Sequence, residues 1–595
     1  MPSRVDAAAV VVWGGGTGGA AAAIQAARGG ANTLLLTPGS WLGGMVSAAG
    51  VCCPDGNELT PWQTGLWGAF LRELERREPE GLDHNWVSCF GYRPTTAEQI
   101  LQDWVRAEPT LLWWPGCRLL AVEREGSLIT AVRVEVAGEQ RRVRCQVVID
   151  GSDRGDLLPL AEAPFRLGWE PKEQWGEPSA PSQERLSSEP FFREQPVQSP
   201  TWVVMGQLQS DAPAPELAEK PRLPAPFEQA CEAFGLERTI TYGRLPGGLV
   251  MLNWPLHGND WHWGLQRAFS GDALQEAELY REMQEFSLRF AKALEEASGG
   301  WLQLGEAFPA ESGSPAPWLA AMPYWREGRR MIGRQTVIEQ DLLPLGDGSL
   351  MAPLPVNEAG ELQTIAIGNY ANDHHYPGPD WPLAAKSCRW GGRWTGTPFC
   401  IPYGALVSEK IPNLLAADKA FSTSHMANGA TRLQPLILNI GQAAGAAAAL
   451  AVQADISPAE LPVPAVQRVL ITDDHAPSAI RPRWDTPWHH PQWSQRQQSA
   501  ECEQPVLQVQ PGLHERRWQG WLERNNNGGY SFVSDGGEQW PVITLEPSMH
   551  QWLLDLNERS AVQVTGRLNP WGPWLCITSG SRLHPTTWGD GDAAL

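Results

Sequence analysis

The stretch that decides the fold is VVVWGGGTGGAAAAIQAARGGANTLLL, residues 10–36. An apolar run over residues 8–13 predicts a buried strand, and the alanine-rich residues 20–28 predict a helix that two glycines end. Residues 33–36 predict a second buried strand. This order of strand, helix and strand predicts the opening βαβ unit of an α/β fold.

Glycines lie between the first strand and the helix in the pattern Gly14-x-Gly16-x-x-Gly19. The first glycine permits a tight turn, the second lets the backbone approach a pyrophosphate, and the third lets the helix pack on the strand. We therefore expect a dinucleotide at the helix N-terminus, with a purely structural glycine turn as the alternative. Thr37 lies where an acid would bind ribose hydroxyls, so this motif fits both NAD and FAD.

Beyond the βαβ unit, three β runs over 118–123, 128–136 and 141–149 predict a small antiparallel layer that returns to a buried strand. Residues 170–225 are rich in Pro, Ser, Glu and Gln, and we expect a long irregular surface excursion there. An amphipathic pattern predicts a long helix over 272–298.

The last hundred residues have a different pattern, and a domain boundary is expected near 485–505. Short β runs separated by glycine-rich and proline-rich turns predict a five-stranded barrel with one helix between later strands. The oligonucleotide/oligosaccharide-binding fold is one barrel of this kind, but fold does not imply ligand, and a packing or partner-contact module is the default. The expected strands are 518–523, 529–533, 539–544 and 560–568, and the expected helix is 549–556.

The composition limits the class of protein. The chain has 595 residues, of which 42% are hydrophobic and 19% charged, so it is predicted to be a folded protein of several domains. Its 46 basic and 67 acidic residues give a formal charge of −21, which disfavours nucleic acid and anionic lipid as partners. Ten cysteines are too sparse for a disulfide scaffold, and no spacing suits a zinc site. We expect a cytoplasmic location.

Two apolar segments bear on targeting and membrane insertion. The apolar residues near the N-terminus end in glycines without a cleavage site, so they are interpreted as a strand and not a leader. The alanine-rich helix near 441–452 is expected to be too short for a membrane span.

Further motifs follow in a fixed order. They are WLGGM at 41–45, VVIDGSDRGD at 147–156, IPNLLAAD at 411–418, GATRLQP at 429–435 and GQAAG at 441–445. Motifs outside the dinucleotide unit are GEP at 176–178, NWPLHGND at 253–260, PYWREGRRMIG at 323–333 and IGNYANDHH at 367–375.

With these motifs the chain closely resembles the bacterial group of FAD-dependent oxidoreductases with a glutathione-reductase-like FAD domain, over about residues 10–452. The resemblance implies that 411–418 is the last FAD strand, that 429–435 is a loop under the flavin ring, and that 441–445 opens a helix facing the pyrimidine edge. Asp418-Lys419 stands where the family tends to have Gly-Arg. The cofactor is therefore expected to be FAD.

The expected architecture is a Rossmann-like FAD-binding domain with a mixed parallel sheet and a small antiparallel layer, an inserted α+β substrate domain and a small C-terminal β-barrel. We expect the FAD domain in 1–160 and 335–460, the substrate or cap domain in 161–334, a linker in 461–504 and the barrel in 505–595. The cofactor-binding residues are expected to be Gly14, Gly16, Thr17, Gly18, Gly19, Thr37, Gly43, Gly44, Met45, Asp150, Asp418, Arg432, Gly441, Gln442 and Ala443.

The candidate catalytic residues are His375, His425, Arg329 and Asn253. Each histidine is a candidate base or a structural side chain, and in an extended segment His374 and His375 would point to opposite sides. The arginines of 326–330 either grip a substrate carboxylate or form an ion-pair network with Glu327. Asn253 has a core-amide alternative.

Other chemistries lack their motifs. We find no H-E-x-x-H, G-x-S-x-G or P-loop sequence, and the adjacent Cys52 and Cys53 are interpreted as small buried side chains rather than a redox pair. The predicted function is hydride transfer from an unidentified small organic molecule to flavin N5, with an unknown electron acceptor. The alternative is a flavin-holding scaffold or sensory protein whose barrel binds a partner.

Overall fold

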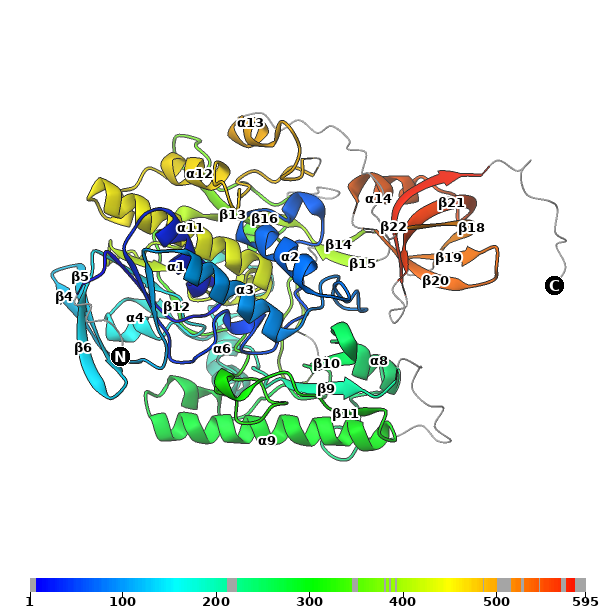
Figure 1. Ribbon diagram of the computed structural model, residues 1–595, viewed down its shortest axis with the longest axis horizontal. Helices are drawn as coiled ribbons and strands as arrows, with labels where there is room; N and C mark the ends of the chain where they lie inside the picture. Colours follow the sequence, from blue (N-terminus) through cyan, green and yellow to red (C-terminus); the bar gives the residue numbers. More distant parts are fainter. Residues whose placement is uncertain are drawn as a thin grey trace.

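The computed structural model of this protein describes residues 7–210, 222–344, 351–378, 381–384, 387–390, 393–484, 486–499, 515–525, 529–544, 546–568 and 574–583. Figure 1 shows a central helical and β body, with the long green helix α9 (Ala273–Ala297) along one side and a red and orange barrel at one end.

The core of the body is a five-stranded sheet in the order β17-β7-β1-β2-β3, and every neighbouring pair is parallel. The first strand, the helix and the second strand are found as predicted, although the helix starts earlier, at Thr17 instead of Ala20. A Rossmann-like parallel sheet is thus confirmed. The elements are β1 Val10–Trp13, α1 Thr17–Arg28, β2 Thr33–Leu36, β3 Leu111–Trp114, β7 Val147–Asp150 and β17 Leu414–Ala416.

The helix α11 (Gln434–Ala454) packs against α1 through its glycines. A Cβ atom added at Gly441 would lie 2.3 Å from the carbonyl oxygen of Gly18, so only glycine allows this approach. The helix has 21 residues and a mean hydropathy of 1.5 in its most apolar window, so the expectation that it is too short to cross a membrane is wrong. That window is 89% buried inside the protein, which is the environment of a core helix.

The antiparallel layer is present as predicted, with one difference. The run expected over 141–149 is two strands, because the chain leaves the layer at Arg144 and enters the parallel sheet at Val147. Two helices that are not part of the βαβ unit complete this part of the body. The bounds are β4 Arg118–Glu125, β5 Leu128–Val136, β6 Glu139–Arg144, α2 Gly65–Arg77 and α3 Pro94–Ala107.

The inserted part combines a three-stranded antiparallel sheet, β10-β9-β11, with α9. Asp272 caps α9 by accepting from the backbone N–H groups of Leu274 and Gln275, which explains why the predicted helix bounds agree with the structure. The region expected to be irregular contains short helices and β9. The bounds are α5 Lys172–Trp175, α6 Gln183–Ser188, α7 Phe191–Glu194, β9 Val204–Leu208, α8 Gly235–Thr241, β10 Leu249–Leu252 and β11 Leu302–Leu304.

Shorter elements connect these parts. They are α4 Leu157–Leu160, β8 Phe165–Arg166, β12 Arg330–Met331, β13 Thr364–Asn369, β14 Ser387–Trp390, β15 Arg393–Gly396, β16 Pro398–Pro402, α10 His425–Thr431, α12 Val463–Ile471 and α13 Trp493–Gln498. Residues 429–431 therefore belong to a short helix, where the resemblance implied a loop.

The C-terminal strands close into a barrel in the order β18-β19-β20-β22-β21, and α14 lies between β20 and β21 along the chain. The predicted barrel is confirmed. The fifth strand had not been located from the sequence. Residue 485, residues 500–514 and the chain after 583, which belong to the predicted boundary and tail, lie outside the described residues. The bounds are β18 Arg516–Arg524, β19 Tyr530–Ser534, β20 Gln539–Ile543, α14 Pro547–Leu554, β21 Arg559–Leu568 and β22 Leu575–Arg582.

Candidate active site

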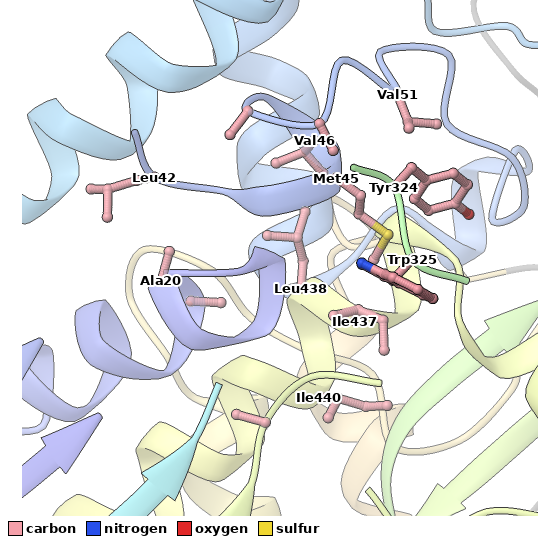
Figure 2. Packing of buried hydrophobic residues seen from close by; sticks show 14 of the residues in the cluster. Ala20, Leu42, Met45, Val46, Val51, Tyr324, Trp325, Ile437, Leu438 and Ile440 are labelled. Atoms are coloured by element: carbon pink, nitrogen blue, oxygen red, sulfur yellow. The ribbon is translucent and has the colours of Figure 1, made fainter. Parts of the chain in front are cut away.

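A cavity of about 570 Å³ opens beside the glycine-rich turn at the end of β1. Its lining includes Trp13, Gly16, Thr37, Asp153 and Trp325, so the cavity lies between the edge of the parallel sheet and the segment that contains Trp325. A volume of this size is typical of a site for a cofactor or small molecule. Figure 2 shows Met45 next to the Trp325 indole, above Ile437 of α11.

The glycines at and beside the turn are closely packed. Gly14 has a φ of +95°, and a Cβ atom there would lie 2.6 Å from the backbone nitrogen of Ser152. A Cβ atom at Gly19 would lie 2.1 Å from the carbonyl oxygen of Gly14, and one at Gly44 would lie 2.9 Å from the Cα of Gly16. Side chains at these positions would therefore fill the turn that lines the cavity.

Two buried indole N–H groups, Nε1 of Trp13 and Nε1 of Trp325, belong to residues that line this cavity and have no hydrogen-bond partner among the described residues. Buried donors are normally satisfied, so this pair indicates a ligand with hydrogen-bond acceptors. Backbone N–H groups of the first turn of α1 add further donors next to the cavity, since a helix N-terminus leaves its first amides without helical partners, although that of Gly18 already donates to Asp418.

The hydroxyl group of Thr37 is already engaged within the protein. It donates to the carbonyl oxygen of Gly39 at 2.7 Å and accepts from Nε1 of Trp113 at 2.9 Å. Its single hydrogen is therefore not available to a ribose hydroxyl. This geometry weakens the prediction that Thr37 anchors the cofactor through a hydrogen bond.

Acidic side chains organise the turns on both sides of the glycine-rich turn. Asp150 accepts from the backbone N–H groups of Ser152 and Leu157, and burial raises its pKa to about 7. Asp418 accepts from the N–H of Gly18 at 2.8 Å, so it caps the first turn of α1. The fully buried ammonium group of Lys419 pairs with Asp153 and lies 3.2 Å from Asp418.

A second group of polar residues, the charged centre, consists of Arg326, Asp260, His375, Asp373 and Arg432. The Nδ1 and Nε2 atoms of His375 each lie 2.9 Å from a carboxylate oxygen, of Asp260 and of Asp373 respectively. Arg326 pairs with Asp260 at 3.0 Å, and Arg432 pairs with Asp373 at 2.9 Å. Four segments far apart in the sequence thus meet in one ion-pair network.

The charged centre keeps its two carboxylates ionised. Burial raises the pKa of Asp260, but Arg326 and His375 outweigh burial and hold the pKa well below the usual range. Burial raises the pKa of Asp373 in the same way, and His375 and Arg432 lower it further than burial raises it. Both ring nitrogens of His375 are thus engaged by carboxylates within the protein, so its predicted role as a base toward a substrate does not fit.

The segment 373–376 separates the charged centre from a further network. Asp373 and His375 face the charged centre, whereas His374 and Tyr376 face Glu327 and His425, so the two adjacent histidines make separate sets of contacts, as an extended segment predicts. We call Glu327, His425, Tyr376 and His374 the histidine network.

Short hydrogen bonds connect the histidine network end to end. Oε1 of Glu327 lies 2.8 Å from Nδ1 of His425, whose Nε2 lies 2.5 Å from the Tyr376 hydroxyl oxygen. The same hydroxyl lies 2.8 Å from Nδ1 of His374, and Nε2 of His374 lies 3.0 Å from the carbonyl oxygen of Met426. The indole of Trp169 covers the ring of His425 at a centroid distance of 3.9 Å.

A family comparison decides the class of protein. The family model described as FAD dependent oxidoreductase matches residues 9–470, which is most of the chain. The chain belongs to the FAD-dependent oxidoreductase family. No curated protein matches it.

Several solved structures are similar to this FAD-dependent oxidoreductase. The flavin-dependent brominase Bmp2 has a TM-score of 0.33 and 10% identity, over 77% of this chain and 82% of that one. A geranylgeranyl bacteriochlorophyll reductase-like protein from Thermoplasma acidophilum has a TM-score of 0.32 and 11% identity, over 79% of this chain and 84% of that one. The aromatic hydroxylase CabE, from angucycline biosynthesis, has a TM-score of 0.29 and 14% identity, over 55% of this chain and 54% of that one. For three of the matched structures, CabE among them, the oxidoreductase spans only about half of the other chain's length or less.

The residues of the cavity fit the cofactor of the family, which is FAD. The close-packed glycines make room for a pyrophosphate, and the first amides of α1 with the indole groups of Trp13 and Trp325 supply donors for phosphate, ribose or adenine acceptors. Gly14, Gly16 and Thr37 line this cavity directly, and Asp418 acts on it through Gly18.

Other predicted site residues lie elsewhere. Gly441, Gln442 and Ala443 do not open their helix: α11 begins at Gln434, because Pro435 is at its first turn, and Gln442 binds the backbone of Leu66 and Ala476. Arg329 contacts the carbonyl oxygens of Arg154 and Phe269, away from the charged centre.

Asn253 is in contact with the charged centre, since Oδ1 of Asn253 lies 3.3 Å from Nη2 of Arg326. Asp260 and Asp373 were not chosen from the sequence, and Glu327 was named only as an ion-pair partner of the arginines, although all three lie within the quoted motifs. The signal that could have found them is chemical: buried histidines and arginines need carboxylate partners.

Proposed function

We propose that this protein oxidises a small organic anion, with hydride transfer to FAD, and passes the electrons to oxygen, a quinone or another acceptor. When bound, FAD supplies a position, N5, that accepts a hydride. The observation that carries the proposal is the composition of the charged centre, in which two arginines and a histidine contact two carboxylates.

The two arginines of the charged centre support an anionic substrate. Arg326 and Asp260 are buried at 1% and 2% exposure, so their charges act in a medium of low dielectric constant, where charges interact strongly. The side chain of Asp373 is 38% exposed, which gives the centre one side open to solvent. A carboxylate entering there would meet Arg432, whose Nε atom has no hydrogen-bond partner among the described residues.

The same charges support rigid orientation of the substrate. Nη1 of Arg432 donates to the hydroxyl of Tyr324 at 2.7 Å, and the guanidinium of Arg326 lies 4.9 Å from the ring centroid of Tyr324. Each arginine is thus fixed by partners on two sides, so its position is set before a substrate arrives. Preorganised cations lower the cost of holding a reacting group in place.

Membership of an oxidoreductase family favours the enzyme over the scaffold that the sequence left open. The choice of hydride transfer over hydroxylation rests on the charged centre, which suits capture and orientation of an acid.

An anaerobic substrate screen tests the proposal. FAD-loaded protein is mixed with small organic acids and with the matching amides, and flavin absorbance is followed. We expect one class of acid to bleach the flavin while its amide does not, and Arg432→Met to raise KM for that acid more than it lowers kcat. Failure of every acid, together with oxygen-dependent hydroxylation driven by a nicotinamide donor, would overturn the proposal.

A further inference from the structure

The histidine network contains more hydrogen bonds than its neutral side chains can supply. Its four contacts are Glu327 to His425, His425 to Tyr376, Tyr376 to His374, and His374 to the carbonyl oxygen of Met426. Each contact needs one hydrogen between its two heavy atoms. Two neutral imidazoles and one phenol supply only three, and a carbonyl and a carboxylate supply none.

The directions of the bonds follow from the fixed end. The carbonyl oxygen of Met426 only accepts, so Nε2 of His374 donates to it, and Nδ1 of a neutral His374 must accept from Tyr376. The Tyr376 hydroxyl has then used its hydrogen and accepts from Nε2 of His425. This leaves Nδ1 of His425 without hydrogen, so the row holds one proton more than its neutral imidazoles and phenol supply, and with both imidazoles neutral that proton is on Glu327. The other arrangement with the same count is a doubly protonated His425 beside a Glu327 carboxylate.

We propose that the histidine network is a proton path that stores one proton on the carboxyl group of Glu327 and can deliver it to His374. The path carries the proton from Glu327 to His374, whose Nε2 is bonded to the carbonyl oxygen of Met426, six residues before Arg432 of the charged centre. All four members act on one another and need not touch the substrate.

The transfer balances without any other reactant. The Glu327 O–H proton passes to Nδ1 of His425, the Nε2 proton of His425 passes to the Tyr376 oxygen, and the Tyr376 proton passes to Nδ1 of His374. Afterwards Glu327 is a carboxylate, His374 is a cation, and Tyr376 and His425 are neutral again. No electron moves, and every O–H or N–H bond that breaks is matched by one that forms.

The groups around the path favour the stored state. Burial raises the pKa of Glu327 to about 7, against the opposing effect of Arg330, and burial with Arg330 lowers the pKa of His425. Burial and His425 likewise lower the pKa of His374, to about 3. The other charged groups that face the network are Glu170, Asp373 and Arg432.

The Glu327 end of the path is protected from water: Glu327 and His425 are buried, whereas His374 and Tyr376 are half-buried. Trp169 lies 3.9 Å from His425 and 5.0 Å from Tyr376 between ring centroids, and Trp381 lies 4.7 Å from Trp169. Exclusion of water at the buried end keeps the stored proton on Glu327 and away from solvent. This cover is what a proton path needs and what an exposed histidine pair would lack.

Infrared difference spectroscopy of the resting protein tests where the proton is stored. The spectrum of Glu327→Gln is subtracted from that of the wild type at pH 6, and we expect the loss of one carboxylic acid C=O band per protein. Glutamine can donate to Nδ1 of His425 as the acid does, so this variant should keep its fold. Nε of Arg330 lies 3.1 Å from Oε1 of Glu327, so the matched control is Glu170→Gln: Glu170 pairs with the same arginine, at 2.9 Å, without being a member of the histidine network, and it should lose a carboxylate band. Loss of a carboxylate band in Glu327→Gln would overturn the proposal.

The delivery step rests on the proposed function and is tested separately. In the FAD-loaded protein we expect the flavin midpoint potential to change its pH slope near pH 7, and Tyr376→Phe to abolish that change because it removes two of the four contacts. Tyr92→Phe is the control, since the buried hydroxyl of Tyr92 has no hydrogen-bond partner among the described residues. An unaltered slope in Tyr376→Phe would overturn the delivery step. The infrared result stands whether or not any organic acid is oxidised, so the two proposals fail independently.

Discussion

At the scale of single residues, Lys419 is the side chain whose loss should be most costly near the cofactor cavity. Its ammonium group is fully buried between Asp153 and Asp418, and Lys419→Met would leave two carboxylates without a cation. We expect the free energy of unfolding to fall by about 3–5 kcal/mol and the bound FAD to decrease. Urea denaturation and flavin content measure both.

Lys410→Met is the matched control for this prediction. The side chain of Lys410 is 66% exposed and forms only a surface contact with Glu409, so its removal should change stability by less than about 0.5 kcal/mol. Equal stability of the two variants would show that the buried ion pairs contribute nothing.

Glu177 makes stability depend on pH. Burial raises its pKa to about 7 although Ser424 and the backbone N–H of Glu339 donate to it. The unfolded chain loses this proton near pH 4.5 and the folded chain only near pH 7. The contribution to stability is therefore complete below pH 4.5 and is lost as the pH rises to 7, by up to about 3 kcal/mol.

Glu177→Gln keeps the neutral form at every pH. We expect the decrease in melting temperature between pH 4.5 and 7 to become smaller in this variant, while the exposed substitution Glu358→Gln leaves the decrease unchanged. A steeper decrease in Glu177→Gln would mean that the buried carboxyl is ionised in the folded protein.

At the scale of elements, the contact between α1 and α11 positions the cofactor-binding turn. Gly441→Ala would place a methyl group 2.3 Å from the carbonyl oxygen of Gly18, in the first turn of α1. The gain in helix propensity is about 1 kcal/mol, and the clash is expected to cost more, so we predict net destabilisation of about 1–3 kcal/mol with weaker FAD binding. Gly536→Ala is the control, because its Cβ would meet only Oγ of Ser534, at 3.6 Å.

The same scale shows what local sequence patterns can reveal. The βαβ unit and α9 follow from periodicity and end signals within each segment, such as the glycines of the first turn and the cap at Asp272. The start of α11 was misplaced because the glycines at 441 and 445 were interpreted as a helix opening. They are contact glycines within the helix, and Pro435 was the available start signal.

At the scale of the whole molecule, the charged centre could be predicted only as a set of residue types. His375 and Asp260 are 115 positions apart, and Arg432 joins them from yet another segment. No periodicity within one segment encodes such a meeting, because tertiary packing alone brings the segments together. The histidines were therefore found as candidates, while the carboxylates that determine their protonation were not.

The attachment of the barrel is also a property of the whole molecule. Ile543 at the end of β20 is 4% exposed and belongs to the main hydrophobic core, and Glu546 forms a hydrogen bond with Thr60 of the body.

We expect Ile543→Asp to detach the barrel, because an aspartate would be buried there without a cation, and to increase the radius of gyration measured by small-angle X-ray scattering. Leu554→Asp, on α14 of the same barrel and 40% exposed before substitution, should leave the radius unchanged. Because the barrel has its own core around Phe532 and Leu553, it should stay folded after detachment. A folded Ile543→Asp protein with the wild-type radius would mean that the polar contacts alone hold the barrel in place.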